Sequence, residues 1–244
     1  MIAGHRGDPK HYPENTMQSF KSALQKGADM IETDIRLSKD GIPVLIHDET
    51  VDRTTNGTGR VGDKTYLELY GLNAGSSADA QHIPTLEEFL EYMAQEDLLL
   101  NLEIKEYYDG TNAEFCQNAI NKIVGLVEKY NLSSKCVFNS FDAFALEYLH
   151  KQYNGKYRLH GFYPYNIMRN VSMNPDEYLY CACVFEHKNI ENYKHLIDNK
   201  IEVWLGAGIK DKEDFKLAVE SGGNLFTSDN PGTAIQILEE LGFR

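Results

Sequence analysis

The chain has 244 residues, of which 42% are hydrophobic and 25% charged, and it contains 19 glycines and 7 prolines. This composition excludes disordered and collagen-like proteins, and the length suits a single domain over residues 1–244 that is large enough for an α/β barrel. The formal charge of −13 results from 24 Lys and Arg against 37 Asp and Glu, and because it repels phosphate backbones we expect no nucleic-acid partner.

Short runs of β-forming residues alternate with longer segments of helical periodicity. Candidate strands lie near 1–5, 30–35, 99–104, 136–140, 158–162, 179–185, 201–205 and 224–228, and candidate helices near 15–26, 85–95, 113–130, 142–153, 189–199, 212–221 and 231–241. This alternation is typical of βαβ units around a parallel sheet, and eight strands predict a TIM (β/α)8 barrel. Residues 163–178 have no clean helical pattern, so an open doubly wound sheet is the alternative.

A tight turn follows the second predicted strand. The sequence Lys39-Asp40-Gly41 separates two apolar runs, and Asp-Gly is a hairpin signal. If Asp40 and Gly41 form the centre of the turn, Asp34 faces His47 to within one residue of register. Residues 49–84 then form a Gly-, Thr- and Ser-rich segment that is too long for an ordinary loop, which predicts a small insertion over the barrel mouth.

Three acidic residues stand where predicted strands end, and in a barrel these ends meet on one face. Glu32 and Asp34 are two residues apart, so their side chains share a face of the strand. An exposed, solvated pair is the alternative, but burial of both acids requires a neutralising cation. Glu103, at the end of an apolar stretch, adds a third carboxylate and favours a metal site. An all-oxygen site suits Mg²⁺ or Ca²⁺.

Two histidines and two cations accompany these acids. A single histidine is more often structural, but His5 ends the first strand and His47 the returning arm of the hairpin. Two imidazoles beside one metal site can exchange protons on opposite sides of a phosphorus centre. Arg6 and Lys105 supply the positive charge that phosphate oxygens require. Ion pairing of these two cations with the neighbouring acids is the alternative, and it does not exclude phosphate binding.

Other strand-end residues carry weaker signals. Tyr163 and Trp204 are candidates for an apolar rim that binds the substrate alcohol, with core packing as the alternative. Gly206-Ala207-Gly208 is read as a turn rather than a phosphate site. The cysteines lack the paired spacing of a zinc site and are expected to be buried, unreactive thiols; they are Cys116, Cys136, Cys181 and Cys183.

The sequence predicts neither a secretory signal nor a membrane span. Residues 1–6 lack the basic stretch and apolar run of a secretory signal. No segment approaches the roughly 18 consecutive apolar residues of a membrane span. We therefore expect a cytoplasmic protein without stable membrane insertion.

The ordered motifs HRG, PENT, GADMIETD, DGIPVLIHD and NLEIK resemble the glycerophosphodiester phosphodiesterase family. The resemblance is densest over residues 4–58 and 84–106, extends loosely to 138–141 and returns at 225–231. It implies a TIM barrel in which Glu32, Asp34 and Glu103 hold a divalent cation and His5 and His47 form the acid/base pair. The implied reaction is hydrolysis of a glycerophosphodiester to sn-glycerol 3-phosphate and an alcohol, by a proposed route through a cyclic ester.

One segment departs from the family pattern. Members often carry Trp-Thr-Val-Asn near the seventh strand, where this chain reads Trp204-Leu205-Gly206-Ala207. We expect activity to be retained and the alcohol preference to differ. A lysophospholipase D-like hydrolase is an alternative reading, and a non-catalytic phosphoester-binding barrel is another.

Overall fold

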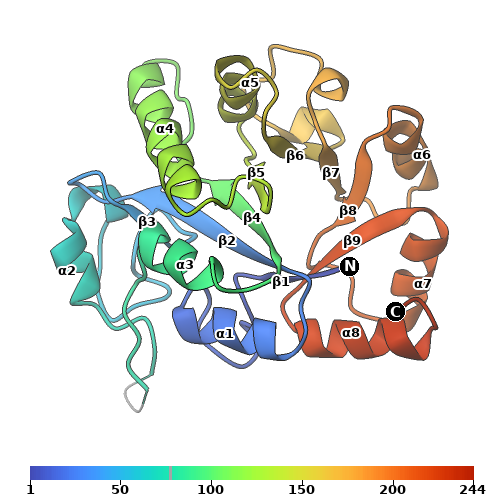
Figure 1. Ribbon diagram of the computed structural model, residues 1–244, viewed down its shortest axis with the longest axis horizontal. Helices are drawn as coiled ribbons and strands as arrows, with labels where there is room; N and C mark the ends of the chain where they lie inside the picture. The colour runs from blue at the N-terminus through green and yellow to red at the C-terminus, as the bar shows by residue number, and fades with distance from the viewer. Residues whose placement is uncertain (77–78) are drawn as a thin grey trace.

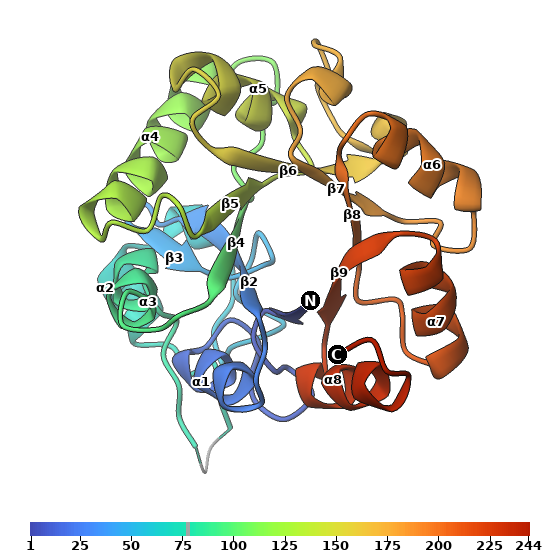
Figure 2. The same cartoon turned by 45° about the vertical axis from the view of Figure 1, so that its right-hand side comes forward.

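The computed structural model describes residues 1–76 and 79–244. In these residues, eight parallel strands close into a barrel. Each strand pairs with its neighbour around the ring, and β9 returns to pair with β1, as Figure 2 shows. The strands of the ring are β1 (Ile2–His5), β2 (Met30–Leu37), β4 (Leu99–Ile104), β5 (Cys136–Asn139), β6 (Arg158–Tyr163), β7 (Cys181–Val184), β8 (Glu202–Leu205) and β9 (Gly223–Ser228). The predicted TIM barrel is confirmed, and the open sheet is excluded.

The helices that connect or follow these strands lie outside the ring (Figure 2). They are α1 (Met17–Gln25), α3 (Leu86–Met93), α4 (Ala113–Lys129), α5 (Ala143–Gln152), α6 (Ile190–Asp198), α7 (Lys212–Glu220) and α8 (Pro231–Glu240). Helix α3 illustrates why they form: Thr85 caps its first turn by accepting from the Glu88 N–H. Its buried residues then recur at helical spacing and face the barrel; they are Leu86, Phe89, Leu90 and Met93.

The connection from β6 to β7 differs from the other crossovers. In the described chain it contains two 3-10 helices, Tyr165–Ile167 and Pro175–Glu177, in place of an α-helix. Glu147 of α5 holds this segment by accepting from the backbone N–H groups of Ser172 and Met173 at 2.8 and 2.9 Å. The missing helical periodicity of residues 163–178 therefore reflects the actual structure.

The hairpin after β2 forms, and its register lies one residue from the central pairing, within the predicted margin. Strand β3 (Pro43–Leu45) runs antiparallel to β2 and pairs Leu45 with Ile35. Asp34 consequently lies opposite Ile46, whose N–H donates to the Asp34 carbonyl at 3.1 Å, and not opposite His47. The reason is a three-residue loop closed by Ser38 and Ile42, in which Gly41 takes a φ of +74°.

The segment between β3 and α3 forms a small unit beside the barrel. It contains a 3-10 helix (Val61–Asp63) and α2 (Tyr66–Tyr70), which begins with a capping box between Thr65 and Glu68. Figure 1 shows this unit beyond β3 at one end of the molecule. Its buried apolar side chains pack with one another and with Val44 of β3; they are Ile46, Val51, Val61, Leu69 and Ile83. Residues 77–78 of the predicted insertion lie outside the described residues.

The interior of the barrel is apolar toward the amino ends of the strands and polar toward their carboxyl ends. A buried apolar cluster fills the amino end; it consists of Ala3, Met30, Val137, Cys181, Trp204 and Leu225. Because inward positions recur every second residue along a strand, the next inward positions lie one layer higher. These are polar and buried, and they include Glu32, Asn101, Glu103, Asn139 and His160. The strands therefore carry their polar groups toward one face of the barrel.

The predictions about cysteines and membrane segments can be compared with the fold. All four cysteines are free and buried, as expected, and burial raises the pKa of the Cys183 thiol to about 12. Within the described ranges, no helix combines the length and apolarity needed to cross a bilayer. The cytoplasmic location, the absence of a nucleic-acid partner and the single-domain boundaries stay predictions.

The chain leaves β1 through a turn with two consecutive positive φ angles, +56° at Arg6 and +91° at Gly7. The Arg6 carbonyl accepts from the Asn15 N–H at 3.1 Å and from the Ser19 hydroxyl at 3.0 Å. A Cβ on Gly7 would lie 2.6 Å from the Ser19 carbonyl carbon. Glycine is therefore required here by both conformation and space.

Substitution of Gly7 tests this requirement. Gly110 also has a positive φ, +99°, but nothing lies within 4 Å of a Cβ built there. Gly110→Ala should cost about 1–2 kcal/mol of unfolding free energy from the backbone alone, and Gly7→Ala a further ~1–3 kcal/mol from the clash. Urea denaturation of both variants measures the difference. Equal losses would show that α1 does not constrain this turn.

Candidate active site

A cavity of about 380 Å³ opens among the carboxyl ends of the barrel strands. Six residues singled out in the sequence line it, although they come from distant segments; they are His5, Arg6, Glu32, His47, Glu103 and Lys105. Asp34 lies directly beside them and is 1% exposed. The barrel has therefore brought the predicted polar residues to one site.

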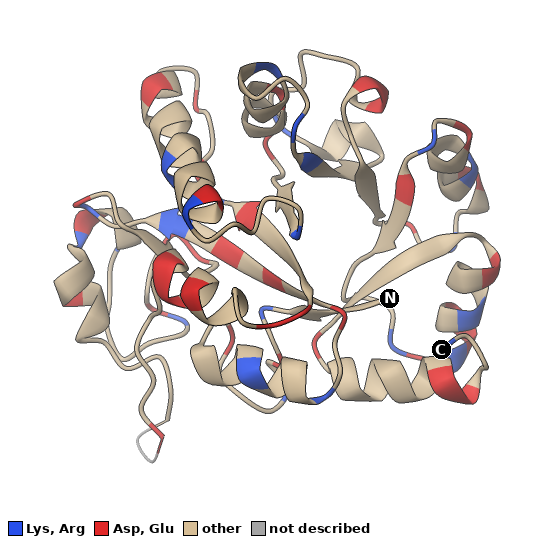
Figure 3. Cartoon of the chain, viewed as in Figure 1, with Lys and Arg blue, Asp and Glu red and all other residues tan. Residues whose placement is uncertain are grey.

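The three acids meet as predicted. One carboxylate oxygen from each of Glu32, Asp34 and Glu103 lies within 4.8 Å of the other two, and all three residues are buried. The register of the neighbouring strands β2 and β4 sets Asp34 beside Glu103. Figure 3 shows acidic positions side by side on these two strands. Three carboxylates at this spacing repel one another strongly unless positive charge lies between or beside them.

Two cations compensate part of this charge. The Lys105 ammonium lies 3.1 Å from Asp34 Oδ1 and also pairs with Glu103. Arg6 Nε lies 3.2 Å from Asp34 Oδ2, while the Arg6 backbone N–H donates to Glu32 at 2.9 Å. The ion pairing considered as an alternative for Arg6 and Lys105 is thus present. Both side chains nevertheless line the cavity, so they also face a ligand bound there.

The compensation is unevenly distributed, as the pKa values indicate. Burial, followed by the charge of Asp34, raises the pKa of Glu32 to about 8. Burial also acts to raise the pKa of Asp34, but Lys105 and Arg6 outweigh it and hold that pKa at about 2. Burial raises the pKa of Glu103 despite Lys105. The triad therefore lacks positive charge, chiefly at Glu32.

The acid triad fits a divalent cation. Its donors are all carboxylate oxygens, the set that Mg²⁺ and Ca²⁺ prefer. The Lys105 ammonium serves both Asp34 Oδ1, at 3.1 Å, and Glu103, while among the described residues Glu32 forms no ion pair. A bound cation would supply the positive charge that buried Glu32 lacks. The buried triad can therefore hold a metal ion.

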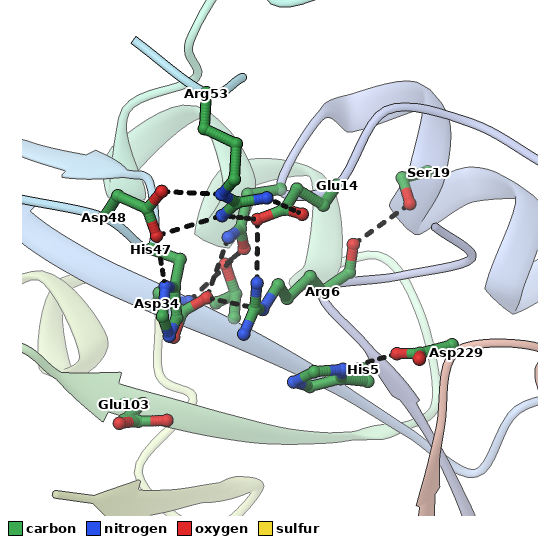
Figure 4. Close-up of polar contacts among 12 residues, drawn as sticks. His5, Arg6, Glu14, Ser19, Asp34, His47, Asp48, Arg53, Glu103 and Asp229 are labelled. Carbon is green, nitrogen blue, oxygen red and sulfur yellow. Dashed lines mark hydrogen bonds and ion pairs between the residues drawn. The ribbon is translucent and has the colours of Figure 1, made fainter. Parts of the chain in front are cut away.

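His5 is oriented by an acid from the last strand of the barrel. Its Nδ1 lies 2.6 Å from Asp229 Oδ1, just beyond β9 (Figure 4). Burial alone would lower the pKa of His5, but the hydrogen bond to Asp229 and the charge of Glu32 raise it. With Nδ1 donating to Asp229, the other ring nitrogen is left to face the cavity.

His47 has a similar arrangement on the hairpin side. Its Nδ1 lies 2.7 Å from Asp48 Oδ1, and Arg53 donates to both oxygens of Asp48, at 2.6 and 3.0 Å. Burial lowers the pKa of His47, although the charge of Asp34 opposes this. Each imidazole of the site is therefore held by its own carboxylate.

A network joins the two sides of the site (Figure 4). Arg53 donates to both oxygens of Glu14 at 2.8 Å, and Arg6 Nη1 donates to Glu14 Oε1 at 2.8 Å. Asn15, the next residue, donates to Asp34 Oδ2 at 2.8 Å. The segment Pro13–Thr16, the PENT motif, thus positions Arg6 through Glu14 and Asp34 through Asn15.

The structure does not bring Tyr163 and Trp204 to the cavity. Trp204 is 1% exposed in the lower interior cluster, where its indole N–H donates to Glu202 at 3.0 Å, so core packing describes it. Tyr163 points away from the cavity and stacks on His195, with 4.8 Å between ring centroids. The apolar lining comes instead from residues that the sequence analysis did not single out, including Phe141, Phe162 and Phe185. Successive side chains of a strand point to opposite faces, so Phe162 and Tyr163 cannot both point into the barrel. This alternation in β6 was the available sequence signal.

Other residues of the site also escaped sequence reasoning. Glu14, Asn15, Asp48 and Arg53 hold the residues that face the cavity, and all but Arg53 lie within a quoted motif. The cavity is also lined by three polar side chains to which the sequence assigned no role; they are Asn101, Asn139 and His160.

Comparisons with known proteins agree with this geometry. The pattern of the Glycerophosphoryl diester phosphodiesterase family matches residues 5–242. A glycerophosphodiester phosphodiesterase from Caldanaerobacter subterraneus subsp. tengcongensis is 32% identical over 256 residues, covering 99% of each chain.

Solved structures have the same fold. The glycerophosphodiester phosphodiesterase from Agrobacterium tumefaciens str. C58 has a TM-score of 0.77 and 25% identity, covering 95% of this chain and 96% of that one. The Oleispira antarctica phosphodiesterase OLEI02445, solved in complex with the product sn-glycerol-3-phosphate, has a TM-score of 0.84 at 24% identity, covering 98% and 96%. The resemblance seen in the motifs, and with it the phosphodiesterase class, is confirmed: the chain belongs to the glycerophosphoryl diester phosphodiesterase family.

Proposed function

We propose that this protein hydrolyses glycerophosphodiesters to sn-glycerol 3-phosphate and an alcohol, with Mg²⁺ or Ca²⁺ bound at Glu32, Asp34 and Glu103. The strongest support is the meeting of three buried carboxylates at a cavity that is also lined by two imidazoles, an arginine and a lysine. The relative from Caldanaerobacter, similar over its whole length, carries the name of this activity.

The acid triad would hold the cation, since its oxygens converge and its charge is incompletely compensated. When bound, a divalent cation polarises a phosphoryl oxygen and lowers the pKa of a coordinated hydroxyl. The protein's own part is to keep the three acids in place, which it does through Asn15, Arg6 and Lys105.

Arg6 and Lys105 bind the phosphate oxygens in this proposal. Both are held by acids on one side and line the cavity on the other. Charges fixed in this way need no rearrangement as negative charge develops on the phosphoryl group. The two ion pairs therefore orient the cations for the substrate as well as neutralising Asp34.

His5 and His47 exchange protons with the attacking and leaving oxygens. Asp229 and Asp48 each accept a hydrogen bond from Nδ1 and so fix the orientation of the imidazole. Positioned general acids and bases typically contribute about 10²–10⁴-fold to a rate. His5 is the last residue of β1, and His47 lies two residues beyond β3.

Removal of either imidazole tests the acid/base proposal. His5→Ala and His47→Ala should each reduce kcat for release of glycerol 3-phosphate from glycerophosphocholine by about 10²–10⁴-fold, with unchanged circular dichroism. His150→Ala on α5 is the control, because His150 does not line the cavity. Full activity in either site variant would remove that histidine from the mechanism.

Metal binding can be tested without activity. Addition of saturating Mg²⁺ or Ca²⁺ to chelator-treated protein should raise Tm by about 5–10 °C, since a ligand at a hundred times its Kd stabilises by about 2.7 kcal/mol. Glu103→Gln should abolish the shift, whereas Glu186→Gln, an exposed residue beyond β7, should keep it. A shift that persists in Glu103→Gln would place the cation elsewhere.

Arg53 is a positioning residue in this proposal, because it binds the partners of both His47 and Arg6. Lysine cannot bridge two carboxylates as guanidinium does. Arg53→Lys should therefore lower kcat by about 10–100-fold with little change in KM. The matched control is Arg60→Lys, whose exposed partner Glu49 does not line the cavity. Equal effects of the two substitutions on kcat would indicate a general effect on the insertion.

A further inference from the structure

One wall of the cavity is aromatic. Phe141 follows β5, Phe162 lies in β6 and Phe185 follows β7, and all three line the cavity. The rings of Phe141 and Phe162 are stacked with centroids 3.5 Å apart and 11° between planes. Phe185 meets both edge-on, at 5.9 and 5.8 Å. We call these three residues the phenylalanine wall.

The wall runs from the interior to the solvent. Phe162 is 5% exposed and Phe185 55% exposed, while Val184 and Ile209 add aliphatic surface beside it. Next to Phe185, the turn after β8 lines the cavity with Gly206 and Gly208, and a Cβ at Gly208 would meet nothing within 4 Å. The mouth therefore has room for a group that lies along the wall and covers its rings.

The floor of the cavity offers hydrogen-bond acceptors instead. Asn139 and His160 are 2% and 3% exposed, and among the described residues Asn139 Oδ1 and His160 Nε2 have no hydrogen-bond partner. His160 Nδ1 lies 3.3 Å from Asn101 Oδ1, so with Nδ1 donating, Nε2 accepts. Hydroxyl groups can satisfy such buried acceptors. In a glycerophosphodiester, the glycerol hydroxyls match this floor, which directs the alcohol outward along the wall.

The charges around the wall decide which alcohol fits. Among the described residues that line the cavity, the carboxylates are Glu32 and Glu103, both in the acid triad, while Glu186, next to Phe185, is exposed and does not line it. The Lys105 ammonium lies 5.8 Å from the centroid of the Phe141 ring. A quaternary ammonium group on the Phe141 ring would therefore have the Lys105 ammonium as its nearest charged neighbour, with Glu103 and Asp34 already paired to that lysine. An uncharged hydrocarbon group buries its surface there without such a cost.

We propose that the phenylalanine wall is the binding site for the alcohol group of the substrate and that it selects alcohols carrying a hydrocarbon chain. This inference rests on the proposed function and adds a substrate class to it. The glycerol end enters the polar floor, the phosphate lies between Arg6 and Lys105, and the hydrocarbon chain extends along Phe141 and Phe162 to Phe185 at the mouth.

The experiment compares three soluble diesters: sn-glycero-3-phosphohexanol, sn-glycero-3-phosphoglycerol and sn-glycero-3-phosphocholine. The wild-type kcat/KM for the hexyl ester should exceed that for the glyceryl ester roughly tenfold or more, as burial of a few methylenes implies. Phe185→Ser should lower this ratio roughly tenfold through loss on the hexyl ester. The matched control is Ile190→Ser, which removes an apolar side chain of similar exposure, 54%, that does not line the cavity. It should leave the ratio unchanged.

The outcomes separate the two proposals. If the wild type hydrolyses none of the esters with added Mg²⁺ or Ca²⁺, the proposed function fails. If it hydrolyses the hexyl and glyceryl esters equally well, or if Phe185→Ser leaves their ratio intact, the enzyme stands and the wall's selectivity is overturned. A preference for the choline ester that Phe185→Ser abolishes would also overturn it, because the wall would then bind a cation.

Discussion

Repulsion among three buried carboxylates is the constraint on which the site depends. The pairing of β2 with β4 sets Asp34 beside Glu103, and Glu32 shares the face of Asp34. The strands cannot relax this contact, because their register is fixed by six consecutive residue pairs and by the apolar layer beneath. The surrounding chain must therefore supply positive charge and hydrogen-bond donors, and much of the local structure serves that need.

The first loop of the barrel illustrates this response. Arg6 adopts a positive φ that a non-glycine residue rarely accepts, and in this conformation its backbone N–H reaches Glu32 while its side chain reaches Asp34. Asn15 also has a positive φ and donates to Asp34. Strained backbone persists where surrounding contacts determine it. Here the acids on β2 are those contacts, so strain and charge compensation occur in the same residues.

Much of this arrangement could be predicted from sequence, because it follows from short-range periodicity. The alternation of strands and helices gave the barrel, and two-residue spacing placed Glu32 and Asp34 on one face. Gly41 was a poorer guide: its positive φ extends the hairpin loop to three residues and shifts the register by one. Tyr163 and Trp204 are predicted at the rim because they stand near strand ends. Tyr163, however, points to the outer face of its strand, and Trp204 lies too deep in the barrel to reach the cavity.

Long-range partners were beyond such reasoning. Asp229 binds His5 from 224 positions away, and Arg53 reaches Glu14 across 39. Neither pair has a periodic relation in the sequence, since each arises when the ring closes or the insertion folds back. The orphaned acceptors of Asn139 and His160 likewise become visible only when their neighbours are in place.

The β6–β7 crossover makes the outer layer of the barrel uneven, because it lacks an α-helix. Where other strands are backed by a helix of 8 to 17 residues, this sector is backed by two single turns tied to Glu147. Segments with fewer protected amides open at lower free energy and exchange hydrogen sooner. Phe162 stands on this sector, whereas the acids stand on β2 and β4, on the side of the ring where α3 and α4 are α-helical. The aromatic part of the cavity thus lies over the crossover without an α-helix, and the acid triad does not.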